Sequence, residues 1–164
     1  QPGINVVAAL SAAGLFDHSG EIRITSTITM VEDVLVTLGH FLNDCRDDAA
    51  GTLAAWKVTH GSATVEIQLL PRAADTHLRV ASGVVHAGAD TDRAALWQEL
   101  LARNADLCGV AFAIRGDQVL LVAERSTLDL DRTEVHDMIQ RTAALADDVD
   151  DDLATRHRAH LGVR

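Results

Sequence analysis

Two tight-turn signals, each between runs that alternate apolar and polar residues, constrain the fold more than any other feature of the chain. The first is HGS at 60–62, between 52–59 and 63–70, and Gly61 can take the positive φ that such a turn needs. The second is RGDQ at 115–118, which again lies between two apolar runs. Alternation with a period of two predicts a half-buried strand, and a tight turn joins antiparallel neighbours. The chain is therefore expected to build an antiparallel sheet.

Two further segments are expected to add strands. Residues 77–85 form one such run, and in 21–29, EIRITSTIT, isoleucines alternate with polar residues. Pro71 is expected to stop the strand at 63–70, because proline has no N–H to donate to a sheet.

Two helices are expected in the first third of the chain. Residues 4–13 are rich in alanine. Thr29 and Glu32 match the capping-box pattern, in which each side chain bonds a backbone N–H, and they are expected to begin a helix at 29–45. On a helical wheel the apolar residues of this helix, apart from Val36, share one side. The residues expected on that core-facing side are Met30, Val31, Val34, Leu35, Leu38, Phe41, Leu42 and Cys45.

Two more helices are expected in the second half. The residues 90–92 open a helix whose apolar side carries Leu96, Trp97, Leu100 and Leu101. DRTE at 131–134 is a second capping box and begins a long final helix. Its apolar arc consists of Val135, Met138, Ile139, Thr142, Leu145, Ala146, Val149 and Leu153.

Together these elements predict the α+β class, with helices packed on an antiparallel sheet of about five to six strands. We expect one domain over 1–164, in which 1–50 is an N-terminal elaboration and 52–155 is the core module. Alternatively, Gly20–Arg46 is an embellishment on a smaller core that begins near residue 52.

The charge of the chain argues against nucleic acid as a partner. The net charge is -10, and Lys57 is the single lysine, whereas nucleic-acid affinity depends on basic side chains at phosphates. With three Phe, two Trp and no Tyr, the chain also offers few platforms for stacked bases or cofactors. No apolar run approaches the roughly 20 residues of a membrane span. Residues 4–15 lack the basic start of a signal peptide, so no stable membrane insertion is expected.

The two cysteines are expected to be structural. Cys45 and Cys108 lie far apart, in apolar surroundings and without metal or redox spacing. Each is predicted to be a small buried hydrophobe, and a disulfide between them is the alternative.

The acidic run DDVDDD at 147–152 is predicted to be a solvated helix face. An EF-hand would need Gly where Leu153 stands, so the run does not match a calcium loop. Replacing Asp150, Asp151 and Asp152 with Asn is expected to be neutral or slightly stabilising, because it relieves repulsion next to Asp147 and Asp148. Loose divalent binding is the alternative.

No histidine is expected to hold a metal or act as a general base. His157 and His160 have a spacing that places them on one helical face, but no third zinc ligand is evident, so they are expected on a fraying polar terminus. His40 lies on a polar helix face, His60 in a turn, and His136 away from the apolar arc. None has an evident carboxylate partner.

The chain carries no signature of catalysis. It has no nucleophile elbow, phosphate-binding loop, dinucleotide fingerprint or zinc-protease motif. No catalytic, cofactor-binding or metal-binding residue is assigned, and the protein is expected not to be an enzyme. An active site assembled from scattered residues would leave no motif, and it remains the alternative.

The stretch 96–147 resembles the YbjN family, within the type III secretion chaperone-like superfamily. The matching features are the helix around Trp97 that ends at Asn104, the strand GVAFAI, a short polar turn, the strand VLLVAE, a Leu-Asp-Leu step and a long final helix. The strands of 52–85 are similar to the three-strand half of that superfamily, so the resemblance covers roughly 52–155. The usual module has one helix before three strands, and the helix expected at 29–45 is additional to it.

The resemblance implies a small acidic cytoplasmic protein, often a homodimer, that holds exported or partly unfolded client proteins on hydrophobic grooves. An edge strand or an apolar groove can bind an extended peptide by backbone pairing and side-chain pockets. No residue is assigned to such a groove. The alternative is a regulatory or structural interaction domain without chaperone activity.

Overall fold

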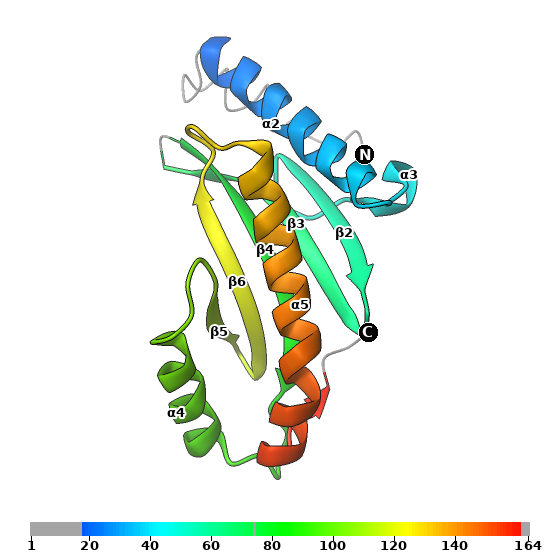
Figure 1. Cartoon of the computed structure of the whole chain (residues 1–164). Coiled ribbons are helices and arrows are strands. Elements are labelled where there is room, and N and C mark those ends of the chain that lie inside the picture. The colour runs from blue at the N-terminus through cyan, green and yellow to red at the C-terminus, as the bar shows by residue number, and fades with distance from the viewer. Residues whose placement is uncertain (1–17, 74, 162–164) are drawn as a thin grey trace. The chain divides into compact units, whose positions relative to one another are not determined.

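The computed structural model describes residues 18–73 and 75–161, so the helix expected at 4–13 lies outside the described residues. Over these residues there are four helices and seven strands (Figure 1). The helices are α2 (His18–Thr37), α3 (Leu42–Cys45), α4 (Arg93–Asn104) and α5 (Arg132–His157). The strands are β1 (Arg46–Asp47), β2 (Ala54–His60), β3 (Ala63–Arg72), β4 (Asp75–His86), β5 (Ala111–Arg115), β6 (Gln118–Ser126) and β7 (His160–Leu161).

The strands form one antiparallel sheet in the order β1-β2-β3-β4-β6-β5, and β7 pairs with β4. The predicted α+β class and the antiparallel sheet are therefore confirmed. The sheet has seven strands over the described residues, more than the expected five to six, because β1 and β7 are pairings of only two residues each.

The chain divides into two compact units, which are described separately. Unit 1 takes the described residues of Gln1–Lys57, Ile67–Arg79 and Arg125–His136. Unit 2 takes those of Val58–Glu66, Val80–Glu124 and Asp137–Arg164. Of the helices in the described ranges, none combines the length and apolar character that crossing a membrane requires.

Both predicted hairpin turns are confirmed. Gly61 joins β2 to β3 with φ +58°, and Gly116 joins β5 to β6 with φ +60°. In the second hairpin Arg115 pairs with Gln118, so the loop is two residues long. A positive φ is costly for side chains with a Cβ, which explains glycine at both turns.

The prediction that Pro71 ends its strand was wrong, since β3 continues to Arg72. The Leu53 N–H donates to the Leu69 carbonyl at 2.8 Å, just before β2 begins at Ala54. Residues two apart in a strand point their backbone groups to the same side. The nitrogen of Pro71 therefore faces the side of β3 on which β2 has already ended, and no ladder bond is lost.

The prediction of a strand at 21–29 was also wrong, because these residues are part of the helix α2. Its buried positions recur every three or four residues, whereas Ile22 is 59% exposed. The threonine hydroxyls are satisfied within the helix, since Thr27 Oγ1 donates to the Arg23 carbonyl at 2.9 Å and Thr29 Oγ1 to the Thr25 carbonyl at 3.1 Å. The buried residues of α2 are Ile24, Thr27, Val31, Val34 and Leu35. Burial along a helical period outweighed the local strand preference of Ile and Thr.

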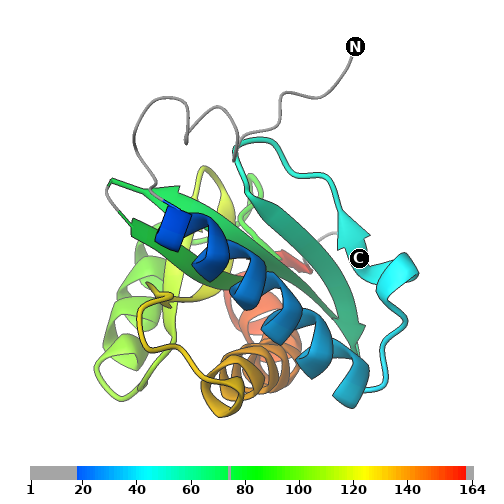
Figure 2. The same cartoon turned by 90° about the horizontal axis from the view of Figure 1, so that it is seen from above.

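The helix predicted at 29–45 has other bounds in the structure, and both predicted ends were wrong. Thr29 lies inside α2 and caps nothing, and α2 stops at Thr37. Gly39 has φ +89°, the Gly39 N–H donates to the Val36 carbonyl at 3.0 Å, and the His40 N–H donates to the Leu35 carbonyl at 3.0 Å. This is the Schellman pattern of a helix end. A short helix, α3, then follows α2 and contacts it (Figure 2).

Unit 2 has a hydrophobic core to which α4, the C-terminal part of α5 and the strands β4, β5 and β6 contribute side chains. Asp92 caps α4 by accepting from the Ala95 N–H at 3.1 Å, and α4 lies beside β5 (Figure 1). Leu101, expected on the apolar side of α4, is instead 72% exposed. The core consists of Ala63, Val84, Val85, Leu96, Leu100, Val110, Phe112, Val119, Leu121, Ala123, Ala146, Val149, Leu153 and Ala159.

The second capping box and the apolar arc of α5 are confirmed. The Glu134 N–H donates to Asp131 Oδ1 at 2.9 Å, and the Asp131 N–H donates to Glu134 Oε2 at 3.0 Å. Of the predicted arc, Met138 and Leu145 are partly buried, and the rest are buried.

The C-terminal end of α5 carries a residue in an unfavourable backbone conformation. Arg158 has φ +54°, and the Ala159 N–H donates to the Ala154 carbonyl at 3.0 Å, so Arg158 occupies the position where helix ends prefer glycine. We expect Arg158→Gly to stabilise the fold by about 1 kcal/mol, because glycine has no Cβ to clash. In a chain of this size that raises the melting temperature by about 2–4 °C. Arg158→Ala keeps the Cβ and is expected to give no gain, and an equal gain in both variants would contradict the explanation.

Candidate functional site

An open hollow lies where α2 ends and α3 begins, within unit 1. It has a volume of about 690 Å³, in the range of hollows that bind ligands. We call it the α2–α3 hollow. The residues that line it are Val36, Gly39, His40, Phe41, Leu42, Asn43 and Asp44.

The hollow exposes large apolar side chains. Phe41 is 79% exposed and Val36 is 56% exposed. Because Gly39 ends α2 before Phe41, this residue leaves the helical face on which the sequence placed it. Phe41 then takes an extended conformation (φ -87°, ψ 120°) at the start of α3. Contiguous exposed apolar side chains of this kind mark binding surfaces.

One carboxylate lines the same hollow, and two more follow it in the sequence. Asp44 lines it, and Asp47 and Asp48 come three and four positions later in the sequence, at the end of β1; all three are exposed and make no ion pair with a basic side chain in the described part of the chain. The only arginine of this segment, Arg46, is held by Glu32, with Arg46 Nε 3.0 Å from Glu32 Oε1. The segment 44–48, which begins in the lining of the α2–α3 hollow, therefore carries a net negative charge.

Both cysteines were predicted to be buried, but only one of them is. Cys45 is buried beside the hollow, and burial, together with the charge of Asp44, raises the pKa of its thiol. Cys45 is therefore a thiol at neutral pH and behaves as a small hydrophobe, as expected. Cys108 is exposed, so the prediction for it was wrong. Both cysteines are free, and the disulfide alternative is excluded in this structure.

The edge strand β5 is a second candidate surface, but part of its edge is covered. Register pairs Arg115 with Gln118 next to the turn, so the backbone groups of Phe112 and Ile114 point away from β6. The side chain of Asn104 hydrogen-bonds both backbone groups of Phe112. Its Oδ1 accepts from the Phe112 N–H at 2.7 Å, and its Nδ2 donates to the Phe112 carbonyl at 3.1 Å. A strand protected in this way is a poor template for pairing with another chain.

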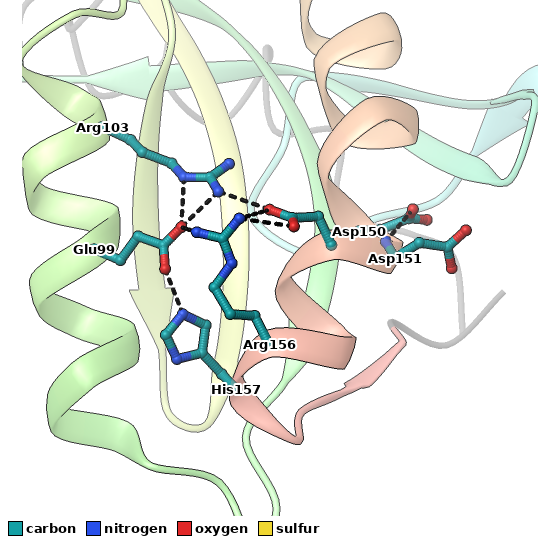
Figure 3. A network of polar contacts seen from close by, with 7 residues as sticks. Glu99, Arg103, Asp150, Asp151, Arg156 and His157 are labelled. Atoms are coloured by element: carbon teal, nitrogen blue, oxygen red, sulfur yellow. Dashed lines mark hydrogen bonds and ion pairs between the residues drawn. The ribbon is translucent and has the colours of Figure 1, made fainter.

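A polar network joins α4 to the end of α5 (Figure 3). Glu99 Oε2 lies 2.5 Å from His157 Nε2, and Glu99 Oε1 accepts from Arg103 Nε at 2.9 Å and Arg156 Nη1 at 3.0 Å. Asp152 binds both arginines, each at 2.8 Å. His157 is buried and paired, so the prediction that it lies on a fraying terminus was wrong. The pairing of His157 with Glu99 was not predicted, because the two residues lie far apart in the sequence.

The network favours the ionised form of Glu99. Burial by itself raises the pKa of this carboxyl, but the hydrogen bonds from His157 and Arg103 and the charges of Arg103 and Arg156 outweigh it. The net result is a pKa below the ordinary value. The group is therefore a fixed anion that, together with Asp152, balances the charges of two guanidinium groups, and it has no proton to offer for catalysis at neutral pH.

The acidic run lies on the exposed side of α5, as the sequence predicted, but three of its carboxylates also bind other parts of the chain. Asp147 Oδ1 accepts from the Ser62 N–H and Oγ, both at 2.7 Å, and Asp150 Oδ2 lies 2.9 Å from Ser62 Oγ. Asp152 is in the polar network. A Cβ added to Gly61 would lie 2.5 Å from Asp147 Oδ1, so a larger residue at this turn would displace the carboxylate from Ser62. The run therefore fastens the β2–β3 turn and α4 to α5, and the triple replacement at 150–152 is no longer expected to be neutral.

Removing the carboxylate of Asp147 tests this role. Asp147→Ala is expected to lower the melting temperature, because the Ser62 N–H loses its acceptor. Hydrogen bonds from Ser62 lower the pKa of Asp147, so its contribution is present above the unfolded pKa and is lost as the pH falls through the folded pKa. Asp148→Ala, on the exposed neighbouring residue, is the control. Equal melting temperatures for the two variants would mean that the contacts of Asp147 with Ser62 do not stabilise the fold.

The remaining histidines are dispersed. His40 lines the α2–α3 hollow, His60 is exposed next to the β2–β3 turn, and His160 lies in β7. His136 is partly buried. Within 18–73 and 75–161, no group of three His, Cys, Asp or Glu side chains is arranged to hold a metal ion. The absence of a metal site stays a prediction.

Comparison with known proteins identifies the family. The family model described as "T3SS (YopN, CesT) and YbjN peptide-binding chaperone 1" matches residues 17–161. The chain belongs to this chaperone family. The match extends beyond the residues 52–155 that carry the resemblance and includes α2 and α3.

Two solved structures have a similar fold. The type III secretion chaperone SycH of Yersinia pestis, in complex with a stable fragment of YscM2, is 18% identical with a TM-score of 0.50, over 72% of this chain and 94% of that chain. A chain of the ExsC–ExsE complex is 14% identical with a TM-score of 0.55, over 84% of this chain and 97% of that chain. No curated protein matches the chain in sequence. These likenesses show that the chain shares its fold with these two proteins at low sequence identity.

The hollow is the feature that sequence reasoning missed. A signal for it is present, since Gly39 follows a helical apolar pattern and is a common residue just past a helix end. A break at Gly39 would have separated Phe41 from the buried face of α2.

Proposed function

We propose that the protein is a non-enzymatic chaperone that binds segments of other polypeptides at the α2–α3 hollow. The observation that carries this proposal is the 79% exposure of Phe41 beside an open hollow of about 690 Å³. Membership of a peptide-binding chaperone family supports it. A large aromatic side chain that fills a partner's surface, or is covered by it, is a common anchor of binding energy.

The clients are proposed to be exported or partly unfolded proteins held in the cytoplasm. The structures of SycH with a fragment of YscM2 and of the ExsC–ExsE complex support a role in binding other polypeptides. A single domain over 1–164, with 52–155 as its core, and association into a homodimer belong to the same proposal.

An aggregation assay tests the proposal. The protein, at a near-stoichiometric ratio, is expected to suppress aggregation of an exported protein that is co-expressed with it, and Phe41→Ser is expected to abolish this effect. Leu101→Ser is a matched control, because Leu101 is similarly exposed at 72% but lies on α4. Suppression that survives Phe41→Ser would place client binding elsewhere. No suppression for any such client, with one folded partner in pull-downs, would favour a regulatory or structural interaction domain.

A further inference from the structure

We propose that the α2–α3 hollow selects segments in which apolar residues are followed directly by basic residues. This inference rests on the proposed function and adds the chemistry of the segment that is bound. Two features occur on one short stretch of chain: the apolar part of the hollow, made by Val36, Phe41 and Leu42, and an acidic border, which is Asp44 in the lining together with Asp47 and Asp48 in the residues that follow it.

The apolar part sets the first requirement. Val36 and Phe41 are 56% and 79% exposed, so a partner that covers them removes apolar surface from water. Each apolar side chain buried in this way contributes about 1.5–3 kcal/mol at most. The hollow is open, so it accepts the side chains of an extended or helical segment and does not enclose a small molecule. One or two apolar residues of the segment are the anchor.

The border sets the second requirement. The one arginine of the border, Arg46, has its guanidinium bound to Glu32, with Arg46 Nη2 2.8 Å from Glu32 Oε1. The three aspartates have no basic partner in the described ranges, and Asp47 Oδ1 accepts only from the Asp48 N–H, at 2.9 Å. Even with Lys57 on β2, the local balance is negative.

Charge complementarity therefore identifies the occupant. A basic residue next to the apolar anchor meets carboxylates that no side chain of the described chain neutralises, whereas an acidic one is repelled. The net charge of -10 acts in the same direction at longer range. Because the border is exposed, its effect is screened by salt, but the apolar anchor is not.

Binding of defined peptides to the full chain tests the inference. The probe is a short fluorescent peptide with a Leu-Leu pair followed by Arg-Arg in a Ser-Gly host, and the matched peptides carry Glu-Glu in place of Arg-Arg, or Ser-Ser in place of Leu-Leu. Two or three exposed ion pairs are expected to make the Arg peptide bind about three- to thirtyfold more tightly than the Glu peptide at low salt. The preference is expected to shrink at high salt, and the Ser-Ser peptide is expected not to bind.

Variants of the protein test whether the apolar and the basic requirement both come from residues of the hollow and its border. Phe41→Ser is expected to abolish binding of the Arg peptide, and the triple variant Asp44→Asn, Asp47→Asn, Asp48→Asn is expected to remove the preference but keep binding through the leucines. Leu101→Ser is expected to change neither. All these residues are exposed, so the fold is expected to be retained, which the melting temperature checks.

Three results would overturn the inference. Equal affinity for the Arg and Glu peptides would reject the charge selection while leaving peptide binding, and so the proposed function, intact. Peptide affinity that rises on Val6→Ser and Val7→Ser would assign the hollow to the chain's own N-terminal segment. A dimer that Phe41→Ser dissociates, without peptide binding, would assign it to a second copy.

Discussion

Replacing Ile139 with Asp is expected to lower the free energy of unfolding by about 4–5 kcal/mol, the range of the largest single-residue effects. Ile139 is 3% exposed on the buried face of α5. The substitution removes a buried apolar side chain and places a carboxylate where it has no partner, and both changes are unfavourable. For a chain of this length the melting temperature is expected to fall by about 10 °C or more, measured by thermal unfolding.

Two comparisons separate burial from other effects of this change. Ala144→Asp adds the same charge at an exposed position of α5 and is expected to cost only about 1 kcal/mol, from the lower helix propensity of Asp and its repulsion from Asp147 and Asp148. A carboxyl in an apolar site takes up a proton more readily, so the loss at Ile139 is expected to be smaller at acidic pH. An unchanged melting temperature for Ile139→Asp would mean that α5 does not pack through this face.

The second large effect is expected for Glu99→Gln. The substitution keeps the shape of the side chain but removes the charge that binds Arg103, Arg156 and His157. Hydrogen bonds to charged groups contribute about 1.5–3 kcal/mol, and the side chain of Glu99 is only 19% exposed. We therefore expect a loss of about 2 kcal/mol at neutral pH, measured by denaturant unfolding.

The pH dependence of this loss has a defined sign. The folded-state pKa of Glu99 is lowered, so the carboxylate stabilises the fold above its unfolded pKa, which is about 4.3 for an unperturbed Glu. As the pH falls below that value and through the folded pKa, the difference between wild type and Glu99→Gln is expected to vanish. Asp106→Asn, an exposed carboxyl just past the end of α4, is the control and is expected to behave like wild type. A difference that grows with falling pH would contradict the assignment.

Interactions between residues close in sequence were predicted well. The Asp131–Glu134 capping box, the turns at Gly61 and Gly116 and the apolar arc of α5 all appear where the sequence placed them. In each case the interacting groups lie within one or two helical turns or on the two sides of a tight turn. The local pattern therefore contains nearly all of the information that decides the outcome.

Two errors came from segments whose local preference is ambiguous. Residues 21–29 alternate like a strand, but Ile24 and Val31 are buried on one face of a helix. Phe41 has the helical spacing of a core residue, but the end of α2 at Gly39 removes it from that face. Isoleucine and threonine fit either structure, so the packing of the whole chain decides between them.

By itself, the sequence determined the α+β class, the antiparallel hairpins and the long final helix, because periodicity and turn residues act over short stretches of chain. Only the tertiary structure decided that Glu99 meets His157, that Asp147 holds the turn at Ser62, and that Phe41 borders a hollow. Glu99 and His157 are separated by 58 positions, and Asp147 and Ser62 by 85. No local pattern encodes such pairings, since they form only when folding brings distant elements together.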